Sequence, residues 1–167
     1  MADFSALHRW EKFAPDIGDN RARPESDRLW LEVKSSMTRV ELQAFDRALK
    51  ELHQGRASEV EKHFAAVKAD EAPDVAAFHA RLETLVVDGY ETALSTCVRL
   101  VGRHTIGGKP VTTLREYIVV VLDLSDGYNL LELPAAVRDA NSVGGSTQLF
   151  SGRRSGGWAG TAESAEN

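Results

Sequence analysis

Apolar and polar residues alternate along residues 29–34 (LWLEVK), so the three aliphatic side chains of this segment share one face. A period of two predicts a half-buried β-strand. The preceding residues 14–28 contain two prolines, a glycine and an Asp-Asn pair without any period, which is typical of a loop. Residues 1–12 fit a short amphipathic helix with an apolar side formed by Phe4, Leu7, Trp10 and Phe13. We therefore expect an N-terminal arm over residues 1–28, followed by a strand.

Helical spacing begins directly after this strand. Thr38 and Glu41 have the S/T-x-x-E spacing of a capping box, in which both side chains bond free N–H groups of the first helical turn. Apolar residues then recur on one helical face at positions 40, 44, 45, 48, 49 and 52. Gly55 is expected to end this helix. Ser58 and Glu61 form a second box, which predicts a short helix before the sequence DEAP. Its inward residues are expected to be Val60, Phe64 and Val67.

A longer helix is predicted from Asp74, because apolar residues keep helical spacing as far as Val101. Gly89 lies in the middle of this pattern and is expected to kink or split the helix, since glycine costs about 1 kcal/mol relative to alanine in a helix interior. The long apolar face could bind a partner, although packing within this chain is the simpler interpretation.

The C-terminal third of the chain alternates turn signals with apolar runs. Residues 102–113 (GRHTIGGKPVTT) predict a loop or a small hairpin. Thr113 and Glu116 then give a third capping box. The run at residues 118–122 is ambiguous, because its β-branched residues favour a strand while the cap favours a helix, and we predict a buried helix. Pro134 suits the first turn of a last helix, which is expected to end near the glycine pair of SVGG.

Composition sets the domain organisation. Beyond residue 145 the sequence consists mainly of Gly, Ser, Ala and a few charges, too little apolar area to offset the entropy of ordering. We therefore predict a flexible tail over residues 146–167 and a single mainly helical domain over residues 29–145. The expected fold class is mostly α, with a short N-terminal strand or small β element, an extended N-terminal arm and a disordered C-terminal tail.

Charge and cysteine usage exclude several classes of function. The formal net charge is −5, and acidic and basic side chains are mixed along the chain, whereas nucleic-acid binding usually requires a basic face. Cys97 is the single cysteine, so no intramolecular disulfide forms, and it is expected to be a small core residue. No apolar run approaches the ~20 residues of a membrane span. We expect a cytosolic protein that binds neither nucleic acid nor membrane directly.

No set of residues predicts a reaction centre. The segment GRHTIGGKP departs from the phosphate-loop pattern, because Arg103 stands at the first glycine position and Pro110 at the hydroxyl position. None of the five histidines pairs with another at helical spacing, as two metal ligands on one helix would. Asp123 and Asp126 could bind a cation, but DLSDGYN is more simply a turn. We therefore expect no enzyme activity, no metal and no cofactor.

Aromatic and basic residues are the candidates for contact with a partner protein. The candidate anchors in the arm and the strand are Trp10, Phe13 and Trp30. In the tail, Arg153 and Arg154 could bind an acidic surface, and Trp158 could act as an anchor. The alternative for this segment is a disordered tail with two solvated arginines.

Two segments, residues 15–45 and residues 107–145, carry a resemblance to a known family. The first contains an I-G-D-N-R arm, an E-V-K strand and M-T-R-V-E at a helix start. The second contains G-K-P-V at a turn and a helix ending in A-V-R-D-A-N before a polar tail. In these motifs the chain resembles the small tail assembly chaperones of long-tailed bacteriophages and related tail-region proteins. The resemblance covers somewhat under half of the chain, and residues 51–101 carry no motif of the family.

The resemblance implies a mostly helical, often self-associating protein that works in the cytoplasm of the host bacterium. There it would coat the tape measure protein while tail tube subunits polymerise around it, without catalytic residues or a cofactor. Two alternatives remain. One is a virion structural component, such as a head–tail connector or minor tail protein, and the other is a small regulatory DNA-associated protein, which the mixed charge disfavours.

Overall fold

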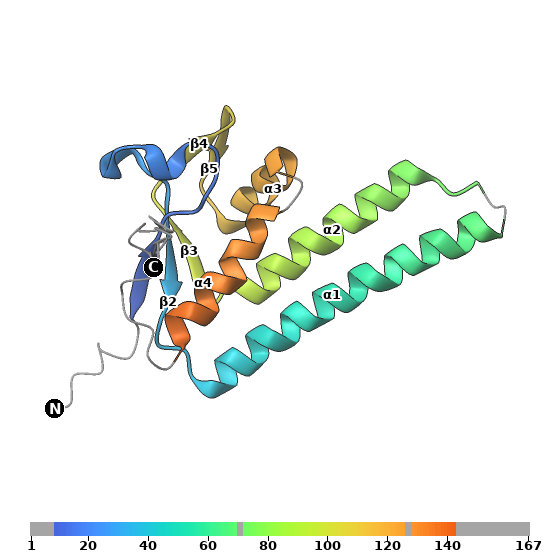
Figure 1. Cartoon of the computed structure of the whole chain (residues 1–167), viewed down its shortest axis with the longest axis horizontal. Coiled ribbons are helices and arrows are strands. Elements are labelled where there is room, and N and C mark those ends of the chain that lie inside the picture. Colours follow the sequence, from blue (N-terminus) through green and yellow to red (C-terminus); the bar gives the residue numbers. More distant parts are fainter. Residues whose placement is uncertain (1–8, 70–71, 126–127, 143–167) are drawn as a thin grey trace, which may run out of the picture.

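The computed structural model describes residues 9–69, 72–125 and 128–142, which form a mostly helical fold beside a small sheet (Figure 1). The helices are α1 (Arg39–Lys68), α2 (Val75–Leu94), α3 (Leu114–Ser125) and α4 (Glu132–Asn141). The strands are β1 (Trp10–Phe13), β2 (Trp30–Lys34), β3 (Val98–Val101), β4 (His104–Ile106) and β5 (Lys109–Val111). Short 3₁₀ helices cover Asn20–Ala22, Glu25–Asp27 and Tyr128–Leu131. Helices α1 and α2 form a long hairpin that projects from the rest of the molecule (Figure 1).

The main sheet has the antiparallel order β1-β2-β3, with the predicted strand β2 in its centre. Trp10 lies opposite Lys34 at one end of the β1–β2 ladder, and Phe13 lies opposite Leu31 at the other. The expected helix over residues 1–12 is therefore wrong where the structure describes it, because residues 10–12 pair as a strand. Residues 1–8 lie outside the described part. Pairing with β2 satisfies the backbone of this segment, and this outweighs a short apolar period that suits a helix.

The described part of the predicted arm, residues 9–28, belongs to the folded domain. Ile17 is buried, and so is Leu29, the residue before β2. The buried side chain of Asn20 donates hydrogen bonds to the carbonyl oxygens of Pro15 (3.0 Å) and Leu29 (3.1 Å) and accepts one from the Leu29 N–H (2.8 Å). This amide fixes the loop against the start of β2, so the expected domain boundary at residue 28 is not a structural boundary. The predicted tail, residues 146–167, lies outside the described residues.

Helix α1 begins as predicted but runs much further. The Glu41 N–H donates to Thr38 Oγ1 (3.2 Å), and the Thr38 N–H donates to Glu41 Oε2 (2.7 Å), which confirms the capping box. The expected end at Gly55 and the expected second start at Ser58 are wrong, because both residues lie inside one helix of 30 residues. Gly55 faces α2, where a Cβ at this position would lie 3.1 Å from Leu85 Cδ1.

Helix α2 is straight through Gly89 but shorter than predicted. A Cβ at Gly89 would lie 2.6 Å from Leu52 Cδ1 and 3.0 Å from Leu52 Cβ, so this glycine permits the close approach of α1 rather than a kink. The helix ends at Leu94, and residues 98–101, which were expected to be helical, form β3. This correction has a tertiary cause, since β3 completes the ladder on the free side of β2.

The predictions for the remaining described elements are confirmed. The strands β4 and β5 form a tight hairpin in which Gly107 (φ 55°) and Gly108 (φ 78°) adopt the left-handed conformation that the turn requires. The Glu116 N–H donates to Thr113 Oγ1 (3.1 Å), as expected for the third capping box. Residues 118–122 are helical within α3, and Pro134 lies in the first turn of α4. The helix α4 ends at Asn141, close to the expected end.

The hydrophobic core lies where the inner face of the main sheet meets helices α2, α3 and α4 and the near half of α1. Its largest fully buried side chains include Tyr117, Leu31, Leu94, Ile118, Leu130 and Leu133. The far half of the α1–α2 hairpin lies outside this core, so Phe64 and Val67, which were expected to point inward, are 59% and 49% exposed. The apolar residues of the inner face of the sheet, such as Leu31 and Val33, are buried in this core, whereas the outer face does not contribute to it.

The hydroxyl of Tyr117 is buried without a hydrogen-bond partner in the described part of the chain, and burial raises the pKa of this side chain. Replacing Tyr117 with phenylalanine removes a polar group whose loss of hydration is uncompensated. We expect the free energy of unfolding to rise by about 1 kcal/mol, measured by urea denaturation. A lower stability of the variant would show that the hydroxyl does bond to another group in solution.

Candidate functional site

The outer face of the main sheet carries two of the predicted anchors. In an antiparallel ladder, residues directly opposite each other point to the same side. Lys12 lies opposite Glu32, Arg99 also lies opposite Glu32, and Trp10 and Trp30 share their side of the sheet. We call the five residues Trp10, Lys12, Trp30, Glu32 and Arg99 the tryptophan face. Its side chains are half-buried or exposed, whereas Leu31 and Val33 on the inner face are buried.

Charged side chains hold both indole rings of the tryptophan face in place. The Arg99 guanidinium lies 4.2 Å from the centroid of the Trp10 ring, and its Nη2 atom is 2.6 Å from Glu32 Oε2. The Trp30 Nε1–H donates to the Glu25 carbonyl oxygen (3.2 Å), while Lys12 Nζ lies 5.9 Å from the Trp30 ring centroid. Contacts of this kind restrict the rings before any partner arrives. A rigid aromatic surface with a charged border is typical of the centre of a protein interface.

The described part of the chain leaves the tryptophan face partly uncovered. At one end, Lys34 lies opposite Trp10 on the same side, is only 7% exposed and pairs with Glu41 at the start of α1. The sheet is fixed to the helices through its inner face and through Asn141 at the end of α4. The Asn141 side chain donates to the Lys34 carbonyl oxygen (2.8 Å) and accepts from the Met37 N–H (2.9 Å). The outer face can therefore stay open without loss of the sheet.

The structure brings together two of the six residues predicted for partner binding. Trp10 and Trp30 lie on the tryptophan face, whereas Phe13 is only 5% exposed and belongs to the core, with the Arg21 guanidinium 5.9 Å from its ring centroid. The three predicted residues of the tail, Arg153, Arg154 and Trp158, lie outside the described residues. Sequence reasoning missed Arg99, because residues 98–101 were expected to be helical. The signal that could have found it is the V-R-L-V pattern, in which one charge interrupts a β-branched and aliphatic run.

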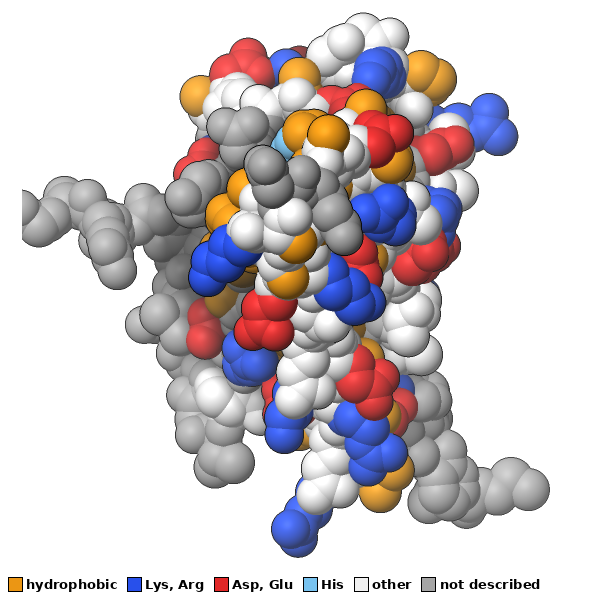
Figure 2. Space-filling model, turned by 90° about the vertical axis from the view of Figure 1, so that its right-hand side faces the viewer, with side chains coloured by type: hydrophobic (Ala, Val, Ile, Leu, Met, Phe, Trp, Pro, Cys, Tyr) orange, Lys and Arg blue, Asp and Glu red, His pale blue; other side chains and the backbone are white. Residues whose placement is uncertain are grey.

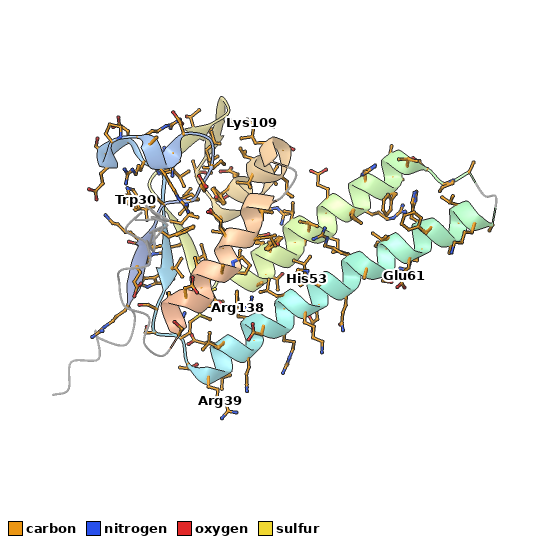
Figure 3. All side chains as sticks on the ribbon, in the orientation of Figure 1. Trp30, Arg39, His53, Glu61, Lys109 and Arg138 are labelled. Carbon is orange, nitrogen blue, oxygen red and sulfur yellow. The ribbon has the colours of Figure 1, made fainter. Side chains whose placement is uncertain are left out.

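A second exposed surface lies at the end of the helical hairpin. The apolar residues Phe64, Val67 and Val75 are 59%, 49% and 52% exposed and define what we call the hairpin tip. The hairpin tip is far from the sheet, as Figure 3 shows by the positions of Glu61 on α1 and Trp30 on β2. Figure 2 views this end of the molecule, where hydrophobic side chains lie between charged ones.

The seam between α1 and α2 changes character toward the hairpin tip. Near the core it is apolar, with Leu52 against Gly89. Further out, the Glu59 carboxylate bonds Lys62 Nζ (2.8 Å) and Arg81 Nε (3.3 Å), and these partners, Lys62 first, lower the pKa of Glu59. The rings of His63 and Phe78 stack with centroids 4.1 Å apart. One ion pair, Glu59 with Arg81, and one ring stack connect the two helices here, so the exposed apolar residues are not needed for the hairpin itself.

The other hollows of the described surface show no cluster of side chains that is typical of a catalytic or metal site. A hollow of about 440 Å³ lies between residues 17–29 and the hairpin of β4 and β5. Its charged groups are partly paired among themselves, since Arg23 Nη2 is 2.6 Å from Asp19 Oδ1 and lowers the pKa of that carboxyl. The described residues contain no group of three or more His, Cys, Asp or Glu side chains that could hold a metal ion. None of the described helices is long and apolar enough to span a membrane.

Cys97 is a buried core residue, as the sequence predicted. Its side chain is fully buried, and burial raises the pKa of the thiol to about 12. A thiol with so high a pKa carries almost no thiolate at neutral pH, and the thiolate is the reactive form. Cys97 is therefore a packing residue.

Comparisons of this chain with protein-family models, with curated proteins and with solved structures find no match.

Proposed function

We propose that this protein is an assembly chaperone of the bacteriophage tail type, which binds apolar segments of a tape measure protein and helps recruit tail tube subunits during tail formation. The observation that carries the proposal is the tryptophan face, where two indole rings held by neighbouring groups remain half-exposed. In this proposal the protein acts in the cytoplasm of the host bacterium and works through contact, without catalysis.

The motifs behind the resemblance are structural and lie near this surface. The E-V-K motif is in β2, the central strand of the sheet, and M-T-R-V-E starts α1. Asn20 of the I-G-D-N-R motif fixes the loop that precedes β2. In this proposal, these three motifs support the tryptophan face.

The chemistry of the two exposed surfaces suits a long partner with apolar stripes. The indoles of Trp10 and Trp30 offer large rigid contact areas at small entropic cost, and Lys12 and Arg99 can pair with acidic residues beside an apolar stripe. The hairpin tip adds a second weak contact at a distance, and two linked contacts bind more tightly than either alone.

Co-expression with a bacteriophage tape measure protein tests the proposal. We expect the native chain to increase the soluble fraction of that protein. The double substitution Trp10→Ala and Trp30→Ala should weaken binding roughly 30-fold or more, because the two aromatic anchors together are expected to contribute at least about 2 kcal/mol to the interface. The affinity is measured with purified proteins by calorimetry.

Val40→Ala is the matched control, since Val40 is an apolar side chain on α1 that is 74% exposed and lies outside the tryptophan face. Circular dichroism shows whether each variant folds. An unchanged solubility of the tape measure protein in the presence of the native chain would refute the proposal. Mass spectrometry of purified particles separates the chaperone from a virion component, because a chaperone is absent from particles while a connector is present in fixed copy number.

A further inference from the structure

One edge of the main sheet is open in the described part of the chain. Strand β1 pairs with β2 on one side, and no described strand pairs with its other side. The opposite edge strand, β3, lies beside the turn between β5 and α3, where a hollow of about 260 Å³ separates them. An open edge presents unpaired N–H and C=O groups, which form a template for pairing with another chain.

The hydrogen bonds of Arg9 show which backbone groups face the open edge. The Ser35 N–H donates to the Arg9 carbonyl oxygen (2.8 Å), so Arg9 and Ser35 extend the ladder by one bonded pair. In an antiparallel ladder, the residues that bond a given neighbour alternate along the strand. Arg9, Glu11 and Phe13 therefore direct their backbone groups toward β2. Trp10 and Lys12 direct theirs toward the open edge.

We propose that residues 9–11 pair antiparallel with residues 9–11 of a second copy of this chain, about a two-fold axis at Trp10. A continuous sheet requires that outer-face residues lie opposite outer-face residues, which leaves registers centred on Trp10, Glu11 or Lys12. The register centred on Glu11 would place two carboxylates opposite each other, and the one centred on Lys12 would oppose two ammonium groups. Like charges directly opposite are destabilising.

The register centred on Trp10 is self-complementary. It places Arg9 of each copy opposite Glu11 of the other, and the two Trp10 residues exchange both backbone hydrogen bonds. Neither Arg9 nor Glu11 forms an ion pair with another described residue, so both side chains are available for this contact. Both Trp10 side chains stay on the outer face, where each ring keeps its contact with Arg99 of its own copy.

This pairing joins the two three-stranded sheets into one sheet of six strands. The tryptophan faces of both copies then form one surface on the same side. The strands are short and bury little area, so we expect a weak dimer with a dissociation constant in the range of tens of micromolar, below the size class of stable dimers. The inference does not require the proposed function, because it concerns only copies of this chain.

Sedimentation equilibrium of the full chain, from about 5 to about 200 µM, tests the inference. We expect a monomer–dimer equilibrium. Each single substitution, Arg9→Glu or Glu11→Arg, turns two attractive pairs into two repulsive ones and should weaken dimerisation roughly 30-fold. The double variant that carries both substitutions restores opposite charges in this register and should regain most of the affinity.

Arg47→Glu is the matched control, since Arg47 is exposed on α1 and does not belong to the main sheet. It makes the same change of charge and should leave the dimer unchanged. Circular dichroism verifies the fold of each variant. A chain that stays monomeric at 200 µM, single variants that dimerise like the native chain, or a double variant that stays weak would each overturn the inference. These results are independent of whether the tape measure protein is bound.

Discussion

Replacement of Glu41 by alanine is expected to lower the free energy of unfolding by about 2–4 kcal/mol. Lys34 Nζ lies 2.6 Å from Glu41 Oε1, and the Lys34 side chain is only 8% exposed. Without Glu41, a nearly buried ammonium group would lose its counter-charge. The expected loss of stability is smaller than for a fully buried pair, because the Glu41 side chain is 37% exposed and water partly screens its charge.

Glu41 also closes the capping box of α1, and Thr38→Ala separates the two contributions. The Thr38 substitution removes the cap but keeps the ion pair, so its expected cost is about 1 kcal/mol. Urea denaturation of the two variants and the native chain measures the difference. Equal losses for both substitutions would show that the buried lysine does not depend on Glu41.

The same pair predicts a dependence of stability on pH. The hydrogen bond from Lys34, followed by the bond from the Thr38 N–H, lowers the pKa of Glu41 from 4.5 to about 2. A carboxyl whose pKa is lower in the folded state stabilises the fold above its unfolded pKa. The difference in stability between the native chain and Glu41→Gln should therefore be full above pH 4.5. It should decrease as the pH falls toward 2.

Replacement of Gly89 by alanine is expected to lower the free energy of unfolding by about 1–3 kcal/mol, although alanine is the better helix former. The new Cβ would lie 2.6 Å from Leu52 Cδ1 and 3.0 Å from Leu52 Cβ. The Leu52 Cβ belongs to the stiff base of the side chain, so relief of the contact requires α1 and α2 to move apart. Thermal and urea denaturation measure the loss.

Gly55→Ala is the matched control in the same hairpin. Its Cβ would meet Leu85 at 3.1 Å, and the nearest atom is the end of a side chain that can rotate. The steric cost should be offset by the gain in helix propensity of about 1 kcal/mol, which leaves the stability nearly unchanged. A double variant of Gly89→Ala with Leu52→Ala should be less destabilised than the sum of the single changes, since the contacts with Leu52 Cδ1 and Cγ are removed. Additive effects would show that Gly89 does not limit the approach of the helices.

Signals that involve residues close in the chain were predictable. The Thr38–Glu41 and Thr113–Glu116 boxes both form, because each needs only residues three positions apart. The hairpin of β4 and β5 follows from Gly107 and Gly108, which supply the backbone conformation of the turn. Cys97 and the run at residues 118–122 also have the predicted buried environment, since their neighbours are apolar.

Signals that depend on distant residues were missed. Gly55 and Gly89 look like helix breakers in the sequence, yet each serves the contact between α1 and α2. Two of the five residues of the tryptophan face were predicted from the sequence, but the arrangement of the face was not. Glu32 and Arg99 lie 67 residues apart and meet only through the β2–β3 ladder. Phe13 was chosen as an anchor for its size, although its position in the register turns it inward.

The amino-acid sequence by itself determined where helices begin, which positions are apolar and where the tight turn lies, since these features depend on neighbouring residues. The tertiary structure alone decided that residues 10–13 and 98–101 are strands, that α1 and α2 continue through their glycines, and that Trp10 and Trp30 share an open face. Strand pairing and helix packing draw their free energy from contacts between distant segments, and this energy exceeds the local preferences of about 1 kcal/mol per residue. The surfaces available to a partner are therefore a property of the assembled fold.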